Sequence, residues 1–133
     1  MAPRHILYWL FTALLAAWLL AGGIFDSIHA PAAIGILRTL GYPPYVCSIL
    51  GAGKLLAVCA LLHPRTRLLR EWTYAGVTFN MLGAFASHLA VHDTIQATVP
   101  PLLLLALSVG SYLLRPAVYR LHAANHSGIR ATP

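Results

Sequence analysis

The sequence predicts an all-α fold: a four-helix transmembrane bundle with both termini cytoplasmic and a short interfacial helix in the first external loop. Three observations support this prediction. Of the 133 residues, 59% are hydrophobic and only 9% are charged, whereas about a quarter of a soluble domain is charged. Four long apolar stretches occupy most of the chain, each about long enough to cross a ~30 Å hydrocarbon core. The arginines lie mainly between and beyond these stretches, where topology signals are found.

The four stretches define the expected spans of a single membrane domain that covers residues 1–133. The first span is expected at residues 6–25. The alternative is a cleaved signal peptide, but this stretch is longer than the apolar region of a typical signal peptide. The other spans are expected at residues 45–62, 72–91 and 98–114, followed by a polar tail at residues 115–133. Aromatic residues near the span ends, and proline pairs at the starts of the second and fourth spans, mark the boundaries.

The distribution of arginine determines the expected orientation. Seven arginines would lie on the cytoplasmic side, against one, Arg38, outside. The seven are Arg4, Arg65, Arg67, Arg70, Arg115, Arg120 and Arg130. In the first external loop, the segment PAAIGILRTLG predicts a short interfacial helix capped by Gly41. Because topology explains the positive charge, we expect no nucleic-acid partner.

Two polar residues, Lys54 and Asn80, lie near the middle of the second and third spans. Counting residues from the span ends places both near the midplane of the membrane. A charged side chain there costs roughly 2.5–3.5 kcal/mol on insertion scales, so Lys54 requires a partner or a function. We predict that the two form a candidate lipophile or proton site. The alternatives are a structural hydrogen bond and a lysine that has become neutral.

Further polar residues gather near the external ends of the spans. We expect Asp26, His29, His92 and Asp93 to form an outer polar cluster. His88 is the deepest histidine, and we assign it to the same lipophile or proton site as the lysine and the asparagine. Histidines and aspartates at a similar depth can bind a metal, or they can be ordinary interfacial residues. No directed ligand signature is present, so no metal ligand is assigned.

The third span carries a row of small or polar residues at spacings of three and four, which places them on one face of a helix. The row consists of Thr73, Gly76, Asn80, Gly83, Ser87 and Ala90. Such a row allows two helices to approach closely, so helix packing is its expected role and a ligand groove is the alternative.

Glu71 lies at the predicted start of the third span, beside Arg67 and Arg70. A carboxylate at a helix N-terminus is favoured by the helix dipole, so we predict that Glu71 is a structural cap. The chain contains no Gly-rich phosphate loop, nucleophile elbow or paired-carboxylate pattern. The residues alone therefore identify no catalytic group, and whether the chain is an enzyme stays open.

The order of several motifs resembles the DoxX-like family of small four-span integral membrane proteins. The motifs are LGYP, G-x-x-K-L-L, E-W-x-Y-A-G and A-x-x-S-H-L-A. The resemblance implies a four-helix membrane bundle. It places the family's lysine on Lys54, its acid before the third span on Glu71 and its histidine at the end of that span on His88. Similar proteins often carry an acid where this chain has Asn80.

The resemblance also implies two hypotheses of function, because family relatives include a quinone-linked oxidising subunit, partners in thiol and superoxide defence, and assembly factors. The first is a redox-associated subunit that binds a quinone or similar lipophile within the bundle. Lys54 and Asn80 would contact a carbonyl oxygen, and His88 would pass a proton outward. The second is a non-catalytic scaffold or assembly partner. Small-molecule transport, a third hypothesis, would require an oligomer.

We expect a multi-pass protein of the cell membrane, specifically the bacterial inner membrane. A quinone is the candidate cofactor. Its expected partners are the lipid bilayer, a soluble or membrane redox protein, and further copies of the same chain.

Overall fold

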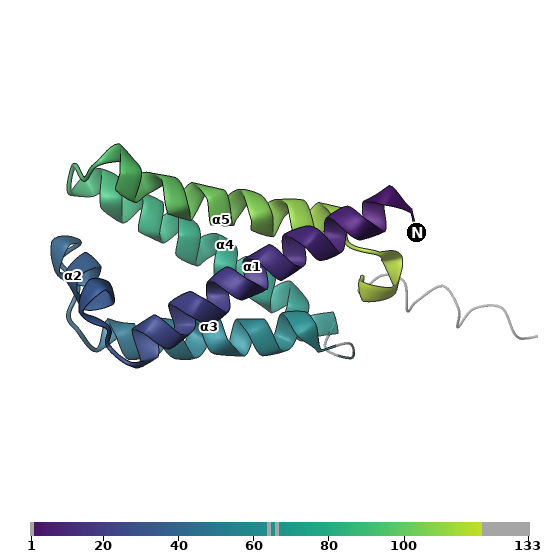
Figure 1. Cartoon of the computed structure of the whole chain (residues 1–133), viewed down its shortest axis with the longest axis horizontal. Helices are drawn as coiled ribbons and strands as arrows, with labels where there is room; N and C mark the ends of the chain where they lie inside the picture. The colour runs from purple at the N-terminus through teal and green to yellow at the C-terminus, as the bar shows by residue number, and fades with distance from the viewer. Residues whose placement is uncertain (1, 64, 66, 121–133) are drawn as a thin grey trace, which may run out of the picture.

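The computed structural model describes residues 2–63, 65 and 67–120, and in this part of the chain it contains helices and no strands (Figure 1). The elements are α1 (Pro3–Ser27), α2 (Pro31–Thr39), α3 (Val46–Leu62), α4 (Arg67–Ala90), α5 (Ile95–Leu114) and the 3-10 turn η1 (Ala117–Tyr119). The all-α prediction is confirmed.

The four long helices run alternately in opposite directions, so α1 begins and α5 ends at the same end of the molecule (Figure 1). We call this the N/C end, and we call the opposite end, where α2 lies, the α2 end. Helices α1 and α4 cross one another, with α3 and α5 along the two sides. Helix α1 packs extensively on α3 and α5, and α4 packs on α5, whereas α3 and α4 make far fewer contacts with each other.

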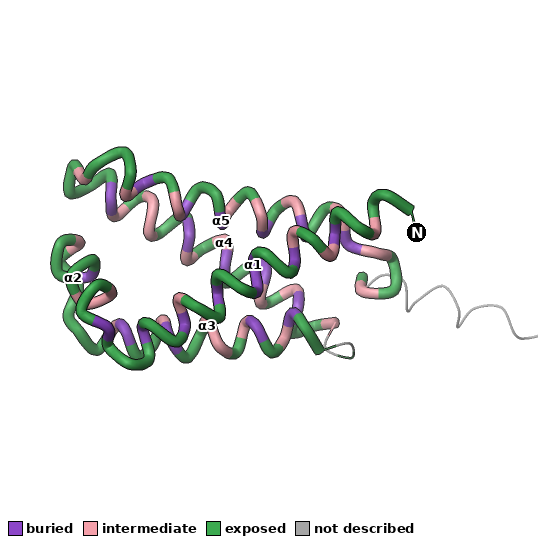
Figure 2. Tube along the Cα trace, viewed as in Figure 1, coloured by how far each residue is buried: buried purple, intermediate pink, exposed green. Residues whose placement is uncertain are grey.

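The apolar core lies where the four long helices cross. It consists of Leu15, Leu19, Val58, Leu61, Tyr74, Val77, Met81 and Leu104. Buried segments face this crossing and the outer sides of the helices are exposed (Figure 2). The outer sides carry many large apolar side chains, such as Phe25, Leu103 and Leu113, which are 54%, 59% and 62% exposed. Extensive apolar exposure of this kind indicates a membrane or a partner surface.

Two of the described helices, α1 and α5, are long and apolar enough to cross a membrane, and α3 is a shorter apolar helix of 17 residues. The helices start close to the predicted spans, with three differences. Helix α1 begins at Pro3 rather than at residue 6. Helix α4 begins at Arg67 rather than at residue 72, and α5 begins at Ile95 rather than at residue 98. The prolines expected to open the fourth span, Pro100 and Pro101, are therefore inside α5. There they remove two backbone hydrogen bonds that an uninterrupted helix would make.

Glycine brings α1 and α3 into backbone contact. A Cβ atom added at Gly51 would lie 2.8 Å from the backbone nitrogen of Ser27 and 3.1 Å from the carbonyl oxygen of Gly23. In contrast, Cβ atoms added at Gly76 and Gly83 of α4 would meet nothing within 4 Å in the described structure. The expected packing role of the α4 row is therefore wrong for these two glycines, which face open space.

The predicted short helix between the first two long helices and its glycine cap are confirmed. Helix α2 ends at Thr39, and Gly41 follows with a left-handed φ of 80°. The Gly41 N–H donates to the carbonyl of Arg38, and the Tyr42 N–H donates to that of Leu37, which is the Schellman pattern.

Helices α1 and α4 end with the same hydrogen-bond pattern, but a histidine occupies the left-handed position. His29 and His92 each have a φ of 53°. Asn, Asp and His occur there more often than other non-glycine residues, yet they lack glycine's freedom. Both turns lie at the α2 end of the molecule, where the two helices finish.

The first part of the predicted polar tail packs against the helices. Tyr119 stacks on Tyr8 of α1, with ring centroids 6.0 Å apart, and the guanidinium of Arg70 lies 4.2 Å from the centre of the Tyr119 ring. The rest of the tail, residues 121–133, lies outside the described residues. Arg130, which was counted for the orientation, belongs to that part.

Candidate functional site

A groove with a volume of about 680 Å³ lies between α3 and α4, and Leu19 of α1 contributes to its lining. Its volume is typical of small-molecule sites. The groove exists because α3 and α4 pack loosely on each other and because α4 presents Thr73 and Gly76, which are small, toward it. The alternative role predicted for the α4 row, a ligand groove, therefore fits its first half.

The groove is mostly apolar, with polar side chains at a few points along its length. Lys54 of α3 and Asn80 of α4 line it toward the α2 end, and His63 lines it at the N/C end. Nine residues separate Lys54 from His63 along the chain, which corresponds to roughly 13 Å of helix. Most of the wall between them is apolar and includes Leu56 and Trp72. The groove thus suits an amphiphile whose polar group lies beside Lys54 and Asn80, and we call this part of the groove its polar end.

The ammonium of Lys54 is paired with the carboxylate of Asp26, with Nζ 2.6 Å from Oδ2. The side chains are 21% and 11% exposed, respectively. Gly22 of α1 lies beside the ammonium, because a Cβ added there would be in ordinary contact with Nζ at 3.5 Å. Asp26 belongs to α1 and does not line the groove. It therefore holds the lysine from behind.

This contact corrects the predicted partner of the lysine. Asn80 lines the same groove as Lys54, but no hydrogen bond joins the two in the described structure. The partner is Asp26, which had been assigned to the outer cluster. Helix α1 continues to Ser27, so Asp26 is its penultimate residue rather than part of the following loop.

The expected outer cluster separates into independent contacts. Asp26 pairs with the lysine, whereas Nε2 of His29 lies 3.1 Å from the hydroxyl of Ser48. Nδ1 of His92 lies 3.3 Å from the carbonyl oxygen of Leu89. Among the described residues, no three His, Cys, Asp or Glu side chains are placed to hold a metal ion together.

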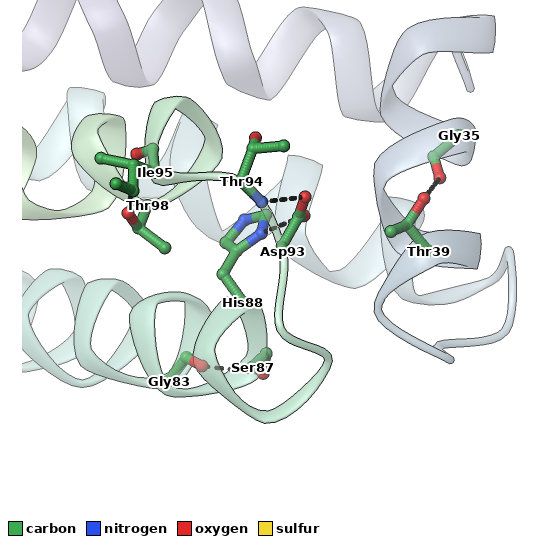
Figure 3. Close-up of polar contacts among 9 residues, drawn as sticks. All are labelled: Gly35, Thr39, Gly83, Ser87, His88, Asp93, Thr94, Ile95 and Thr98. Atoms are coloured by element: carbon green, nitrogen blue, oxygen red, sulfur yellow. Dashed lines mark hydrogen bonds and ion pairs between the residues drawn. The ribbon is translucent and has the colours of Figure 1, made fainter.

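His88 does not line the groove and faces the turn between α4 and α5 instead. Its Nδ1 lies 2.8 Å from Oδ2 of Asp93, and Oδ1 of Asp93 accepts the backbone N–H of Thr94 at 2.7 Å (Figure 3). The hydrogen bond from His88, followed by that from Thr94, lowers the pKa of the Asp93 carboxyl. His88 is only 7% exposed. His88 was predicted to belong to the same lipophile or proton site as Lys54 and Asn80, nearer the outside. It lies outside the groove that those two residues line, and its contact with Asp93 closes the α4–α5 turn.

Glu71 is the fifth residue of α4, and the first turn of that helix contains no acidic residue. Its predicted role as a helix cap is therefore wrong. Instead, Oε1 of Glu71 lies 2.6 Å from Nη1 of Arg115, which follows α5. Arg115 is 5% exposed, and its guanidinium lies 4.3 Å from the centre of the Tyr112 ring. This ion pair joins α4 to the end of α5.

A second buried arginine completes the N/C end. Arg70, expected in a loop, is 1% exposed within α4. It donates to the hydroxyl of Tyr8 at 3.2 Å and to the carbonyl of His63 at 3.0 Å. Nearby, the hydroxyl of Ser111 lies 2.7 Å from those of both Thr12 and Tyr74. These contacts tie α1, α4 and α5 together and leave the N/C end closed.

Sequence reasoning missed Asp26 as the partner of Lys54 and Arg115 as the partner of Glu71. For the first pair a signal was present. Gly22 and Gly23 precede Asp26 on α1, and Gly51 precedes Lys54 on α3. Glycines at these offsets indicate a close helix approach that brings the two charged residues together.

Comparison with known proteins gives one match. A sequence model of the DoxX-like family matches residues 10–111, which include Asp26, Lys54, Asn80 and Glu71. No curated protein matches the chain. No solved structure matches it either.

Proposed function

Since this chain belongs to the DoxX-like family, a membrane-associated family, we propose that it is a multi-pass protein of the cell membrane. In this proposal α1, α3, α4 and α5 form a four-span bundle with both termini cytoplasmic. The lengths and composition of α1 and α5 support it. Helix α3 extends for about 25 Å, close to the thickness of the hydrocarbon core. Helix α4 contains no Asp, Glu, Lys or Arg from Trp72 to Ala90.

The orientation rests on the arginines. Arg4, Arg70 and Arg115 lie at the N/C end, whereas Arg38 lies on α2, and cytoplasmic loops carry the excess of positive charge. Alkaline phosphatase, which is active only outside the cytoplasm, tests this arrangement. A fusion after Gly41 should be active, and a fusion after Leu114 should be inactive. The reverse result would refute the proposed orientation.

Within this membrane protein, we propose that the α3–α4 groove binds a quinone or a similar lipophile, and that the chain serves as a redox-associated subunit. One observation supports it most: a largely apolar groove of about 680 Å³ is lined by a lysine on α3 and by an asparagine on the facing helix α4. The ammonium has three N–H donors, of which Asp26 accepts one, so others can donate to a carbonyl oxygen in the groove. A bound quinone would supply the capacity to accept electrons, and a redox partner protein would supply the electrons.

The two cysteines of α3 provide a direct test of this groove. Cys59 is exposed and lines the groove, whereas Cys47 is buried. A decyl-tailed, fully ring-substituted benzoquinone, which does not add to thiols, should slow maleimide labelling of Cys59 in a saturable way. Lys54→Met should raise the half-protecting concentration at least about tenfold, because a hydrogen bond from a charged group contributes about 1.5–3 kcal/mol.

Arg38→Gln, a charge removal on α2, serves as the matched control and should leave the protection unchanged. Absence of saturable protection in the unsubstituted protein would refute lipophile binding. That result would favour the second candidate function, a scaffold or assembly partner.

The second candidate is supported by the open face of α4. Gly76 and Gly83 have nothing within 4 Å of an added Cβ, and Phe79 beside them is 76% exposed. In a membrane, small residues on such a face allow another helix to pack closely. Gly83 does not line the groove, so Gly83→Ile separates the two functions. It should abolish association with a membrane partner, detected by crosslinking, and leave quinone protection of Cys59 intact.

A further inference from the structure

Lys54 is approached from two sides. On one side is the groove, which the lysine lines. On the other is α1, from which the Asp26 carboxylate reaches to 2.6 Å of the ammonium. Asp26 is only 8% exposed and contributes nothing to the groove lining. A ligand in the groove therefore meets the ammonium, while the carboxylate stays behind it.

The backbone contact between α1 and α3 fixes this arrangement. Gly51 lies one turn before Lys54, and Ser27 follows Asp26 directly. A Cβ added at Gly51 would lie 2.8 Å from the Ser27 backbone nitrogen. Because the two helices touch at this point, the backbones that carry the aspartate and the lysine are held close together. The pair is thus a built-in feature of the groove's polar end.

The pair determines the charge that a ligand meets. Among the described residues that line the groove, Lys54 is the only Lys, Arg, Asp or Glu. Asp26 neutralises it, so the polar end carries no net charge. A ligand carboxylate or phosphate would have to lose its hydration and share a cation that is already paired. An uncharged carbonyl oxygen accepts an N–H of the ammonium without adding a second anion.

The α4 wall of the groove, which faces Lys54, is also uncharged at this point. Asn80 of α4 contributes an uncharged amide that can both donate and accept. It supplies no second cation for an anionic head group. The polar end therefore offers hydrogen bonds on both walls without an unpaired charge.

We propose that Asp26 is the specificity-determining residue of the groove: by neutralising Lys54 from α1, it selects lipophiles with an uncharged oxygen acceptor over those with a carboxylate or phosphate head. The accepted class includes quinones, ketones and esters. This inference rests on the proposed function, because it takes the groove as the ligand site. Asp26 acts through Lys54 and is a positioning residue.

A pair of probes with the same chain tests the inference. Methyl decanoate carries an uncharged ester and decanoate carries a carboxylate. For each protein, the half-protecting concentration of each probe is measured from maleimide labelling of Cys59 at neutral pH. The quantity compared between variants is the ratio of the two half-protecting concentrations, ester to carboxylate. The two probes partition differently into detergent, but this difference is the same for every variant and therefore cancels.

In Asp26→Asn, the half-protecting concentration of decanoate should fall at least about tenfold relative to that of methyl decanoate. The reason is that the ligand carboxylate then becomes the counter-ion of Lys54. Asp26→Glu keeps the charge and should retain the original ratio. The double variant Asp26→Asn with Lys54→Gln has no cation and should show no gain for decanoate. If Asp26→Asn does not fold, Asp26→Ser, which admits water to the ammonium, should give the same shift.

An unchanged ratio in the neutral variants would overturn the inference while leaving the groove as a lipophile site. A gain for decanoate in the double variant would also overturn it, because the effect would not act through the lysine. Absence of protection by either ester or quinone in the unsubstituted protein would instead refute the proposed function itself. The two failures are therefore distinguishable.

Discussion

Replacing Gly51 by alanine tests whether α1 and α3 meet at backbone contact. The added Cβ would lie 2.5 Å from the Ser27 hydroxyl oxygen, 2.8 Å from the Ser27 backbone nitrogen and 3.1 Å from the Gly23 carbonyl oxygen. Two of these atoms belong to the α1 backbone, so a change of rotamer cannot relieve the overlap. Gly53, two residues further along α3, would meet nothing within 4 Å. Gly53→Ala is therefore the matched control.

The expected magnitude follows from two opposing terms. Alanine is favoured over glycine in a helix by up to about 1 kcal/mol, so Gly53→Ala should be neutral or stabilising. Overpacking typically costs about 1–3 kcal/mol, and the upper half of that range applies where the backbone must move. We expect Gly51→Ala to lower the free energy of unfolding by about 1–2 kcal/mol. The two variants should therefore differ by about 2–3 kcal/mol.

Cys47 provides the assay, because it is buried and lies one turn before Gly51. In a Cys59→Ser background, a thiol-reactive dye should label it only on unfolding, which gives a thermal midpoint in detergent. A change of 1 kcal/mol corresponds to a few degrees in the midpoint, so the variants should differ by roughly 5–15 °C. Equal midpoints for the two alanine variants would refute the close approach of α1 and α3.

Three further predictions use the same thermal assay. Glu71→Gln leaves Arg115 without its counter-ion and should lower stability by about 3 kcal/mol, whereas no change would show that the pair is dispensable. His92→Gly should raise stability by about 1 kcal/mol, because glycine adopts the left-handed conformation without strain. His92→Val should lower stability, because a β-branched residue is strained there. The opposite order of the two variants would contradict the left-handed φ of residue 92. The lowered pKa of Asp93 contributes stability above its unfolded-state value of 3.8, and this contribution is lost as pH falls through the lower folded-state value. The thermal midpoint should therefore decrease as the pH is lowered from about 5 to about 3, and it should decrease less in Asp93→Asn. An equal decrease in the two proteins would argue against the His88 contact.

The helices could be predicted from the sequence because their signals are local. Apolar stretches of sufficient length predicted the four long helices, and a short apolar segment with Gly41 at its end predicted α2. The boundaries were less accurate. Arg67 to Arg70 resemble a charged loop, yet they form the first turn of α4. Arginine and leucine are good helix formers, so the helix starts before the apolar stretch does.

The contacts between helices could not be predicted in the same way. Counting residues from the span ends gives the depth of a residue, but it says nothing about the direction of its side chain around the helix. Lys54 and Asn80 therefore seemed paired by depth, whereas the packing of α1 on α3 gives the lysine to Asp26. Glu71 resembled a cap because its partner, Arg115, is 44 residues away in sequence.

The two ion pairs of the described structure that involve Lys or Arg differ in a way that bears on function. The Arg115 guanidinium lies over an aromatic ring and is 5% exposed, while its partner Glu71 is 21% exposed. The Lys54 side chain remains 21% exposed and borders a groove of about 680 Å³. A buried pair must overcome the desolvation of both charges and is by itself weak evidence of stabilisation. The open side, where N–H donors face an apolar groove, is what a ligand oxygen would complete.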